Sequence, residues 1–419
     1  MRKDTATRTE AVPALVLGSG VTALGVIRLL GRSGIPVYCL SDRRDFATTS
    51  RFCRGVFRVE RPAGIASLTA TLARLPFERA LLFPCSDTWV DVVGALDGRL
   101  ARRFPSTVAH DNVRLLTDKG HFAAAMRRCH IPHPRTAMIA TGADLSALDE
   151  AYCAGMFLKP RHSQAFASHF GVKGFAVDSR ADAMRRFDDV SRAGFDLVLQ
   201  EYIPGPPCSH YFLDGFVDRT GRICGLFARR RIRMHPEPLG NTTSAVSIPL
   251  DEIRPAVEAI ERLASCLPLR GIFSAEFKYD SRDGEFKIIE INARPWWFVE
   301  FAAACGVDVC TMAYRDALGL PLTGVSSYAV GKTGTFITKD LRSCRSLWRR
   351  HALSLRQWIA SWRRTSPLIL SWRDPLPGVW HLVAEGREIL HERFHWRERA
   401  VTVPPVDRAT PNAPQTRVA

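Results

Sequence analysis

The apolar positions near the start of the chain form short runs separated by one helical stripe. Residues 14–17 are a short apolar run, residues 18–20 are a Gly-Ser-Gly turn signal, residues 21–32 have the spacing of an amphipathic helix, and residues 35–40 are a second apolar run. This order predicts a strand–helix–strand unit. The glycine turn is typical of dinucleotide-binding folds, but glycine before a helix also serves close packing, so the turn is weak evidence for NAD.

A further apolar run ends in polar residues. Residues 81–87 predict a buried strand that finishes with Ser86 and Asp87. Ligands collect at the carboxyl ends of strands in an open α/β sheet, so these side chains could face a substrate. Capping of the helix predicted over residues 88–96 is the stronger interpretation, and the two roles are compatible.

Two later apolar runs predict a β-hairpin. Residues 271–279 and 285–292 are rich in β-branched and aromatic side chains, and an Asp-Gly turn signal separates them. On such a hairpin Glu276 and Glu290 can lie across from each other. The alternative is that the two acids are exposed to solvent and that the arginine lies near them without a functional role.

The hairpin carries candidate metal chemistry. The carboxylates of Glu276 and Glu290 and the amide carbonyl of Asn292 form an all-oxygen set, which suits Mg²⁺ and leaves room for phosphate oxygens and water. Mn²⁺ is an alternative ion. Arg294 follows with a planar cation that can grip a phosphoryl group, so we expect it to take part in catalysis.

A lysine near the end of another apolar run suggests an anion site. Residues 156–160 read Met-Phe-Leu-Lys-Pro and predict a strand. Burial of the Lys159 stem would aim its ammonium group at an anion such as a phosphate.

Several separated blocks carry a family pattern in a fixed order. They are Val-Leu-Gly-Ser-Gly at 16–20 with Gly25, Phe-Pro-Cys-Ser-Asp-Thr-Trp at 83–89, Thr-Asp-Lys at 117–119 through Pro132, Phe-Leu-Lys-Pro at 157–160, Leu-Gln-Glu-Tyr-Ile-Pro-Gly at 199–205, Glu276, and Glu-Ile-Asn-Ala-Arg-Pro at 290–295. The ordered set resembles the ATP-grasp superfamily, and within it the carboxylate–amine ligase branch of D-aspartate ligase-like and carbamoyl-phosphate-synthase-like enzymes. No single block is specific, but their ordered co-occurrence is.

The resemblance implies how a nucleotide would be held. By it, Lys119 and Lys159 reach the phosphates of ATP, while Glu201 and Ile203 read the edge of adenine at the hinge between two lobes. No acid follows in residues 206–210, so the ribose contact is unassigned.

The loop after Lys159 departs from the family pattern. Many members have a Gly- and Ser-rich loop there that closes over the phosphates, whereas this chain has none of those glycines, as is common in the D-aspartate ligase-like branch. The group that covers the γ-phosphate is left open among Arg161, His162 and Ser163.

An arginine-rich run follows the hinge. Alternation on a strand places Arg229, Arg231 and Arg233 on one face. In similar ligases the matching basic strand meets the transferred phosphate and the substrate carboxylate, so the resemblance assigns a catalytic role to Arg231 or Arg233 rather than Arg229. A nucleic-acid patch is the weaker alternative.

Composition fits a globular enzyme. The 419 residues are 46% hydrophobic, which is ample for two or three domains with cores. The eleven cysteines include no C-x-x-C pair, so neither a zinc site nor a disulfide framework is indicated. The start of the chain lacks the apolar core of a signal peptide, and no apolar window is long enough to span a membrane. We therefore expect a cytoplasmic protein.

The last part of the chain is basic and rich in tryptophan. From Lys332 onward, 16 Lys/Arg stand against 7 Asp/Glu, and this part holds six of the nine tryptophans. Peripheral contact with an anionic membrane and packing onto the catalytic body are equally good interpretations. No segment resembles a nucleic-acid recognition fold, and residues 401–419, polar and Pro-rich, predict a loose tail.

The whole pattern predicts an α/β protein in three parts. These are an N-terminal open parallel-sheet domain over residues 1–116, a two-lobed ATP-grasp body over residues 117–322, and a helical extension over residues 323–419. The predicted activity is ATP-dependent ligation of a small carboxylate, activated as an acyl phosphate, to an amine. The alternatives are a carboxylase- or kinase-type ATP-grasp enzyme and a regulatory or membrane-surface module with degenerate catalysis. Neither substrate nor the oligomeric state follows from the sequence.

Overall fold

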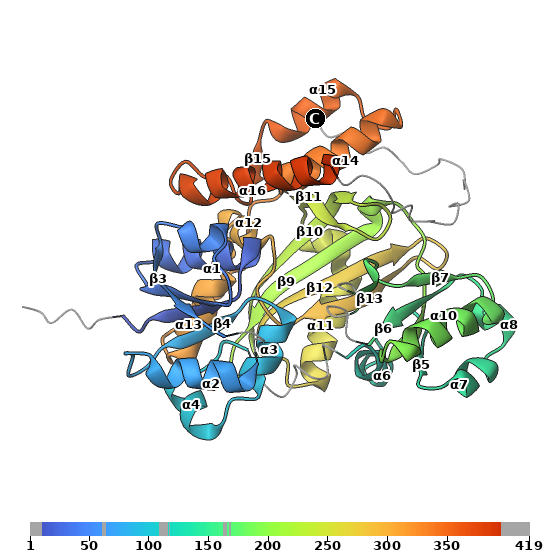
Figure 1. The fold of residues 1–419 in the computed structure, drawn as a ribbon, viewed down its shortest axis with the longest axis horizontal. Helices are drawn as coiled ribbons and strands as arrows, with labels where there is room; N and C mark the ends of the chain where they lie inside the picture. The colour runs from blue at the N-terminus through green and yellow to red at the C-terminus, as the bar shows by residue number, and fades with distance from the viewer. Residues whose placement is uncertain are drawn as a thin grey trace, which may run out of the picture.

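The protein is built around three β-sheets. The computed structural model describes residues 11–60, 64–108, 116, 118–161, 166 and 169–394, with the backbone alone for residues 388–394. Figure 1 shows an N-terminal part at the left, a large sheet at the centre, a small lobe at the right and C-terminal helices at the top. None of the helices in these ranges is long and apolar enough to cross a membrane.

The N-terminal part is a parallel sheet with the strand order β3-β2-β1-β4. Its strands are β1 (Ala14–Leu17), β2 (Val37–Ser41), β3 (Cys53–Arg58) and β4 (Leu81–Pro84). Its helices are α1 (Gly20–Arg32), the 3₁₀ helix η1 (Phe46–Thr49), α2 (Ile65–Arg74), α3 (Asp87–Gly94) and α4 (Gly98–Arg103). Alternate residues of β1 enter two different cores, with Ala14 and Val16 on one face and Leu15 and Leu17 on the other. The predicted strand–helix–strand unit is confirmed.

The start of α1 is occupied by a side chain of the same chain. Gly18 and Gly20 have φ angles of +117° and +80°, which explains the two glycines of the turn. The Gly20 N–H donates to the carboxylate of Asp45, so an acid already lies where a dinucleotide pyrophosphate would bind. This contact favours the packing interpretation of the glycine turn over NAD binding.

The small lobe is an antiparallel sheet with the order β5-β8-β6-β7. Its strands are β5 (Thr136–Ile139), β6 (Met156–Pro160), β7 (Phe175–Val177) and β8 (Leu197–Glu201). Helices α6 (Lys119–Arg128), α7 (Gly142–Ser146), α8 (Glu150–Cys153) and α10 (Arg180–Arg192) accompany it. On β6, Leu158 packs into the core of the lobe, so Phe157 and Lys159 on alternate positions face away from that core.

The large sheet has seven strands in the order β13-β12-β9-β10-β11-β14-β15. They are β9 (His210–Val217), β10 (Ile223–His235), β11 (Asn241–Ser247), β12 (Gly271–Asp280), β13 (Glu285–Asn292), β14 (Thr333–Thr335) and β15 (Thr365–Pro367). The short helices η2 (Pro207–Ser209) and η3 (Leu250–Ile253) lie between strands. All neighbouring strands are antiparallel except β14 and β15.

Helices cover both faces of the large sheet. On one face α11 (Arg254–Cys266) packs Ile260 and Leu263 against Phe273 and Phe277 of β12. On the other face α12 (Val299–Ala304), α13 (Val309–Ala317) and α1 share a core with β9 and β10. Because α1 belongs to the N-terminal part, this core joins that part to the large sheet over a continuous apolar interface.

The C-terminal extension is helical but also enlarges the sheet. It comprises α14 (Ile337–Arg349), α15 (Leu355–Trp362) and α16 (Pro375–Phe394), and its β14 and β15 extend the large sheet beyond β11. The sequence pattern predicted a helical extension. Two three-residue strands are too short to produce a detectable alternation, and here they form because the free edge of β11 pairs with β14, which in turn pairs with β15.

Buried ion pairs fix this extension to the rest of the protein. Arg28 of α1 is fully buried and donates to the Asp374 carboxylate, Nε to Oδ2 at 2.9 Å, and to the carbonyl of Ile369 at 2.8 Å. Asp374 also accepts from Ser50 Oγ at 2.7 Å and from the Arg51 backbone N–H at 2.9 Å. The residues just before α16 are therefore held by the N-terminal part.

Candidate active site

The two glutamates predicted to pair do lie side by side. In the antiparallel β12–β13 pair, Glu276 is the direct cross-strand partner of Glu290, with a register shift just after Glu276. The connecting turn contains Gly284 at a φ of +77°, as its turn signal predicted. The hairpin prediction is confirmed, and its two acids reach the same face of the large sheet.

Glu276 is held in its ionised form by two basic neighbours. Its Oε1 accepts from Arg231 Nη2 at 2.9 Å and from His210 Nδ1 at 2.7 Å, and 17% of its side chain is exposed. Burial alone would raise the pKa of Glu276, but the Arg231 charge and the His210 hydrogen bond outweigh burial and hold the pKa well below its usual value. A carboxylate that stays ionised over the whole physiological range can serve as a metal ligand.

Arg294 connects the hairpin to the N-terminal part. Its Nε donates to Asp87 Oδ1 at 2.6 Å and its Nη2 to Asp87 Oδ2 at 3.0 Å, while Nη2 also donates to Asn292 Oδ1 at 3.0 Å. Burial would lower the pKa of Arg294, but the Asp87 charge raises it above its usual value. The preceding residue, Ser86, caps α3 by accepting from the Trp89 N–H at 3.3 Å. The two polar residues after β4 thus have separate roles, since Ser86 caps the helix and Asp87 positions the arginine.

Two lysines of the small lobe, Lys119 and Lys159, interact electrostatically with Glu290. Lys159 donates to Gln200 Oε1 at 2.9 Å, and Lys119 donates to the Arg161 carbonyl at 3.3 Å. Burial and the nearby Lys119 charge lower the pKa of Lys159 to about 8, while Glu290 acts in the opposite direction. Burial also lowers the pKa of Lys119 against the attraction of Glu290. Both ammonium groups are therefore partly desolvated, which strengthens their interaction with an anion.

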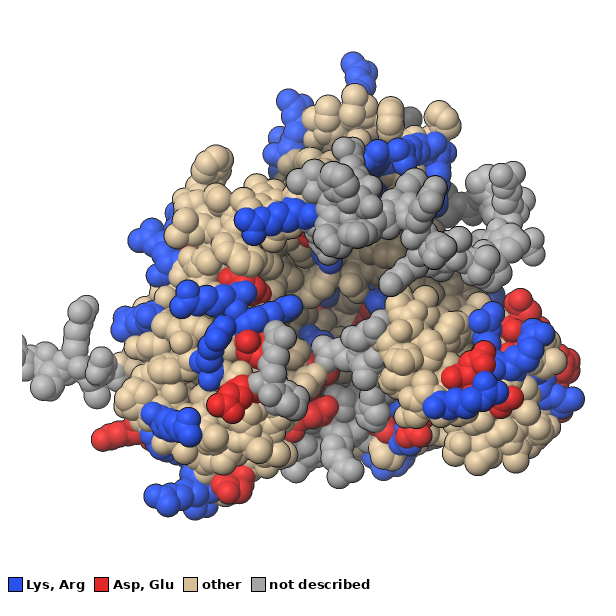
Figure 2. Space-filling model, viewed as in Figure 1, with Lys and Arg blue, Asp and Glu red and all other residues tan. Residues whose placement is uncertain are grey.

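The arginines of β10 alternate as the sequence predicts. Arg229, Arg231 and Arg233 are all buried on one face, whereas Arg230 pairs with the half-exposed Glu252 on the other. Figure 2 shows that the molecule is hollowed near its centre, with Lys and Arg side chains in the hollow.

The three buried arginines have different partners. Arg229 binds Asp214 at 2.7 Å, Arg231 binds Glu276, and Arg233 binds Asp340 of α14 through two hydrogen bonds of 2.9 and 2.7 Å. Arg231 is thus the one that contacts a predicted metal ligand. The predicted catalytic role of Arg233 stays a prediction.

The predicted adenine contacts lie at the end of β8. The Glu201 carboxylate accepts from Arg282 Nη2 at 2.7 Å and from the Arg135 backbone N–H at 3.2 Å. Ile203 is buried, and its backbone N–H has no hydrogen-bond partner among the described residues. A buried backbone donor of this kind can bind a ring nitrogen of a base. Glu201 and Ile203 remain predictions as nucleotide contacts.

Comparisons with known proteins agree with this architecture. No family model matches the chain. A curated D-aspartate ligase of Enterococcus faecium (strain Aus0004) is 22% identical over 326 residues, which cover 73% of this chain and 76% of the relative.

Similar solved structures extend over about the same part of the chain. Biotin carboxylase of Campylobacter jejuni has a TM-score of 0.60 at 16% identity, covering 76% of this chain and 74% of its own. N5-carboxyaminoimidazole synthetase of Staphylococcus aureus has a TM-score of 0.59 at 13% identity, covering 77% and 80%. L-amino acid ligase of Bacillus licheniformis has a TM-score of 0.55 at 14% identity, covering 74% and 75%.

This chain has the ATP-grasp fold. The predicted α/β class, with a parallel N-terminal sheet before a two-lobed body, is confirmed. Within this fold, the hairpin acids Glu276 and Glu290 lie on the large sheet, and Lys159 lies on the small lobe.

The oxygen donors of the candidate site fit a Mg²⁺ ion bound together with phosphates. No group of three or more His, Cys, Asp and Glu side chains that could hold a metal occurs within the described ranges. Glu276 and Glu290 are two carboxylates, however, and Asn292 Nδ2 lies 3.3 Å from Glu290 Oε1, so its amide is next to them. Mg²⁺ is commonly held by one or two carboxylates plus substrate phosphates and water, and this set supplies that number.

Three candidates for covering the γ-phosphate were left open, and two of them, His162 and Ser163, lie outside the described residues, as does Thr117. Arg161 is described, and its guanidinium binds the Asp118 carboxylate at 2.5 and 3.1 Å. Asp118 in turn caps α6 through the N–H groups of Gly120 and His121, so the loop begins anchored to the helix that carries Lys119.

The structure adds two residues to the candidate site that the sequence did not single out. They are His210, which binds Glu276, and Lys278, whose pKa is lowered to about 8 by burial and the Arg231 charge. The structure also pairs Asp87, which the sequence placed at the end of a strand, with Arg294. Lys278 stands two positions after Glu276 on β12, so strand alternation could have placed it on the same face. Nothing in the sequence pairs Asp87 with a residue about two hundred positions later.

Proposed function

We propose that this protein is an ATP-dependent carboxylate–amine ligase that forms ADP and phosphate. The observation that carries the proposal is the Glu276–Glu290 pair, together with the cations Lys119, Lys159, Arg231 and Arg294 whose charges interact with Glu290. Two acids among several cations suit a metal–triphosphate complex, which carries both signs of charge. The D-aspartate ligase and the L-amino acid ligase that resemble this chain support the proposed ligase activity.

The nucleotide would lie between the small lobe and the large sheet. We assign Lys119 and Lys159 to the phosphates, and Glu201 with the Ile203 N–H to the adenine end. Phe157 supports this placement because it lies on the same face of β6 as Lys159, where an aromatic ring can pack on the base. Two similar solved structures, N5-carboxyaminoimidazole synthetase of Staphylococcus aureus and the biotin carboxylase domain of 2-oxoglutarate carboxylase of Hydrogenobacter thermophilus, hold ADP, which agrees with a nucleotide at this fold.

Glu276, Glu290 and Asn292 would hold Mg²⁺, with Mn²⁺ as an alternative. When bound, the ion would neutralise charge on the β- and γ-phosphates. Glu276 is prepared for this role by Arg231 and His210, which keep it ionised before any metal arrives.

The reaction would run in two steps. A substrate carboxylate oxygen attacks the γ-phosphorus, the bond from that phosphorus to the β–γ bridging oxygen breaks, and ADP leaves with the bridging oxygen. The amine nitrogen then attacks the acyl carbon, the C–O bond to phosphate breaks, and the amine releases its proton as the amide forms. Arg294 and Arg231 would stabilise the negative charge on the transferring group and the acyl phosphate. No protein nucleophile is required.

Several further assignments form part of this proposal. We divide the chain into residues 1–116, 117–322 and 323–419. We propose that the first part forms one side of the substrate-binding site, to which Asp87 contributes. The substrates would be a small carboxylate and a small amine, with an amino acid as one partner. A reducing cytoplasm suits the protein, since all eleven cysteines are described and none forms a disulfide.

A substrate screen tests the proposal. Phosphate release from ATP and Mg²⁺ would be measured with pools of amino acids and small carboxylates, and active pools would be resolved by mass spectrometry for a new amide. The proposal predicts phosphate release that requires both a carboxylate and an amine. Turnover that depends on bicarbonate, or a stable phosphorylated product, would instead support a carboxylase- or kinase-type enzyme.

A further inference from the structure

Helix α16 turns its apolar side outward. Leu376, Val379, Trp380 and Val383 expose between 43% and 60% of their surface, at the spacing of one helical stripe. The opposite side, with Gly378, is buried against the protein. This is the reverse of an ordinary surface helix, whose apolar stripe faces the core.

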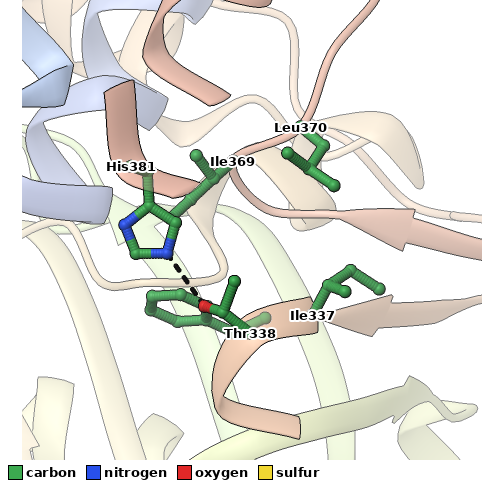
Figure 3. Close-up of a pocket in the computed structure, with 6 residues that line it drawn as sticks. Ile337, Thr338, Ile369, Leu370 and His381 are labelled. Atoms are coloured by element: carbon green, nitrogen blue, oxygen red, sulfur yellow. Dashed lines mark hydrogen bonds between the residues drawn. The ribbon is translucent and has the colours of Figure 1, made fainter. Parts of the chain in front are cut away.

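Polar contacts hold α16 in this orientation. His381, on the buried side, lies 2.8 Å from Thr338 Oγ1 through its Nε2 (Figure 3). Arg342 of α14 binds Glu385 at 3.1 Å. Asp374, just before the helix, is held by the buried Arg28. The apolar stripe is therefore fixed outward by specific partners on the other side.

Neighbouring segments also expose large apolar side chains. Trp372, just before α16, is 100% exposed, and Trp348 of α14 is 51% exposed. Among the described residues, ten of the fifteen exposed large apolar side chains lie between Leu341 and Val383. Single exposed apolar residues are normal, but such a concentration marks an interaction surface. Figure 1 places α14, α15 and α16 together at one end of the molecule.

The same segment carries a strong positive charge. Residues 332–387 contain eleven Lys/Arg and three Asp/Glu. The three acids are already paired, Asp340 with Arg233, Asp374 with Arg28 and Glu385 with Arg342. The charge presented outward is therefore positive, and Figure 2 shows Lys and Arg side chains projecting at this end. We call the exposed apolar residues of 341–383, with the arginines between them, the apolar–basic face.

We propose that the apolar–basic face binds the surface of an anionic lipid bilayer. Leu, Val and Trp side chains would enter the boundary between headgroups and acyl chains, and the arginines would pair with lipid phosphates. Charge complementarity selects this occupant. A second copy of the chain would bring two positive surfaces together, and nucleic acid would leave the aliphatic residues of α16 without a partner.

Vesicle flotation of the full chain tests this proposal independently of catalysis. The protein should float with vesicles of phosphatidylcholine mixed with phosphatidylglycerol and not with phosphatidylcholine alone. Raising the salt from low to high concentration should weaken binding about tenfold or more, because the screening length shortens. The double variant Val379→Asp/Val383→Asp should lose flotation while its melting temperature and ATP turnover stay unchanged.

A matched control tests whether vesicle binding requires this face or any exposed apolar residue. Leu320 is 42% exposed and lies outside the face, so Leu320→Asp should float like the unaltered protein. The proposal is overturned if the full chain ignores anionic vesicles at low salt, or if Val379→Asp/Val383→Asp still floats. It is also overturned if gel filtration shows that this variant dissociates a dimer, since a second copy would then cover the face.

Discussion

Asp87 and Arg294 form a doubly hydrogen-bonded ion pair that joins two parts of the protein at the candidate site. The bonds measure 2.6 and 3.0 Å, and the same arginine also binds Asn292 at 3.0 Å. Asp87 begins the helix after β4, whereas Arg294 follows the strand that carries Glu290. The planar guanidinium is thereby fixed in orientation as well as position. The N-terminal sheet thus helps to set the geometry of the candidate site, including Arg294, which we propose binds phosphate.

Replacing Asp87 by Asn should lower kcat more than it changes KM for ATP. The fold stays intact, but Arg294 loses its charged partner, and a misplaced cation should slow turnover about tenfold to a hundredfold. Steady-state kinetics would measure this. Asp97 is a suitable control because it caps α4, and Asp97→Asn should leave turnover unchanged. A normal kcat in Asp87→Asn would remove the positioning role.

Replacing Lys159 by Ala should weaken ATP and ADP but not adenosine. The lost charge-assisted contacts to phosphate amount to about 1.5–3 kcal/mol, or roughly tenfold to a hundredfold in Kd. Calorimetry with the three ligands would measure it. Lys332, an exposed lysine near β14, provides the control, since Lys332→Ala should bind all three normally. Equal losses for all three ligands would show that Lys159 does not contact phosphate.

ATP affinity should fall as the pH rises above about 8. The pKa of Lys159 in the free protein is lowered to about 8, and bound phosphates favour the protonated ammonium. Below that pH the lysine is charged and Kd should be constant, whereas above it Kd should rise. Lys159→Arg should flatten the profile because arginine stays protonated. A profile identical in both proteins would contradict this assignment.

The Arg233–Asp340 pair should matter for stability. Asp340→Asn leaves a buried arginine without its full partner and should lower the free energy of unfolding by about 3–5 kcal/mol. The double variant Arg233→Met/Asp340→Leu should recover part of this loss, as urea unfolding would show, because Thr243 and Trp362 also donate to Asp340 and lose their partner. If Arg233 is also catalytic, turnover in the double variant stays low while stability recovers. Recovery of both stability and turnover would mean that Arg233 serves only to anchor α14.

Local patterns predicted the elements that carry the site. The Asp-Gly turn and the two apolar runs placed Glu276 opposite Glu290, and the Met-Phe-Leu-Lys-Pro run placed Lys159 on a strand with its stem buried. These predictions succeeded because strand alternation and turn chemistry act over a few residues. The resemblance supplied the ATP-grasp fold, which the structural comparisons confirm.

Long-range partners could not be predicted in the same way. The contacts of Asp87 with Arg294, of Arg233 with Asp340 and of Arg28 with Asp374 each join residues far apart in the chain. Their pairing depends on how the sheets pack. The chain also contains several other oppositely charged residues with which each of these side chains could have paired. The tryptophan-rich segment left two interpretations open, packing onto the body and membrane contact. Trp362 donates to the buried Asp340 at 2.7 Å, which is a packing contact, whereas Trp372 is fully exposed and membrane contact stays a proposal.

Transfer of a carboxylate oxygen to phosphate tests the central claim most directly. Amino acids labelled with ¹⁸O in the carboxylate would be incubated with ATP, Mg²⁺ and an amine pool, and the released phosphate would be analysed by mass spectrometry. A ligase that forms an acyl phosphate must leave one labelled oxygen in the phosphate, and Glu290→Gln, which removes a metal ligand but keeps the hairpin, should abolish the signal. Phosphate without label while a new amide forms, or labelled phosphate from Glu290→Gln at the normal rate, would contradict the account.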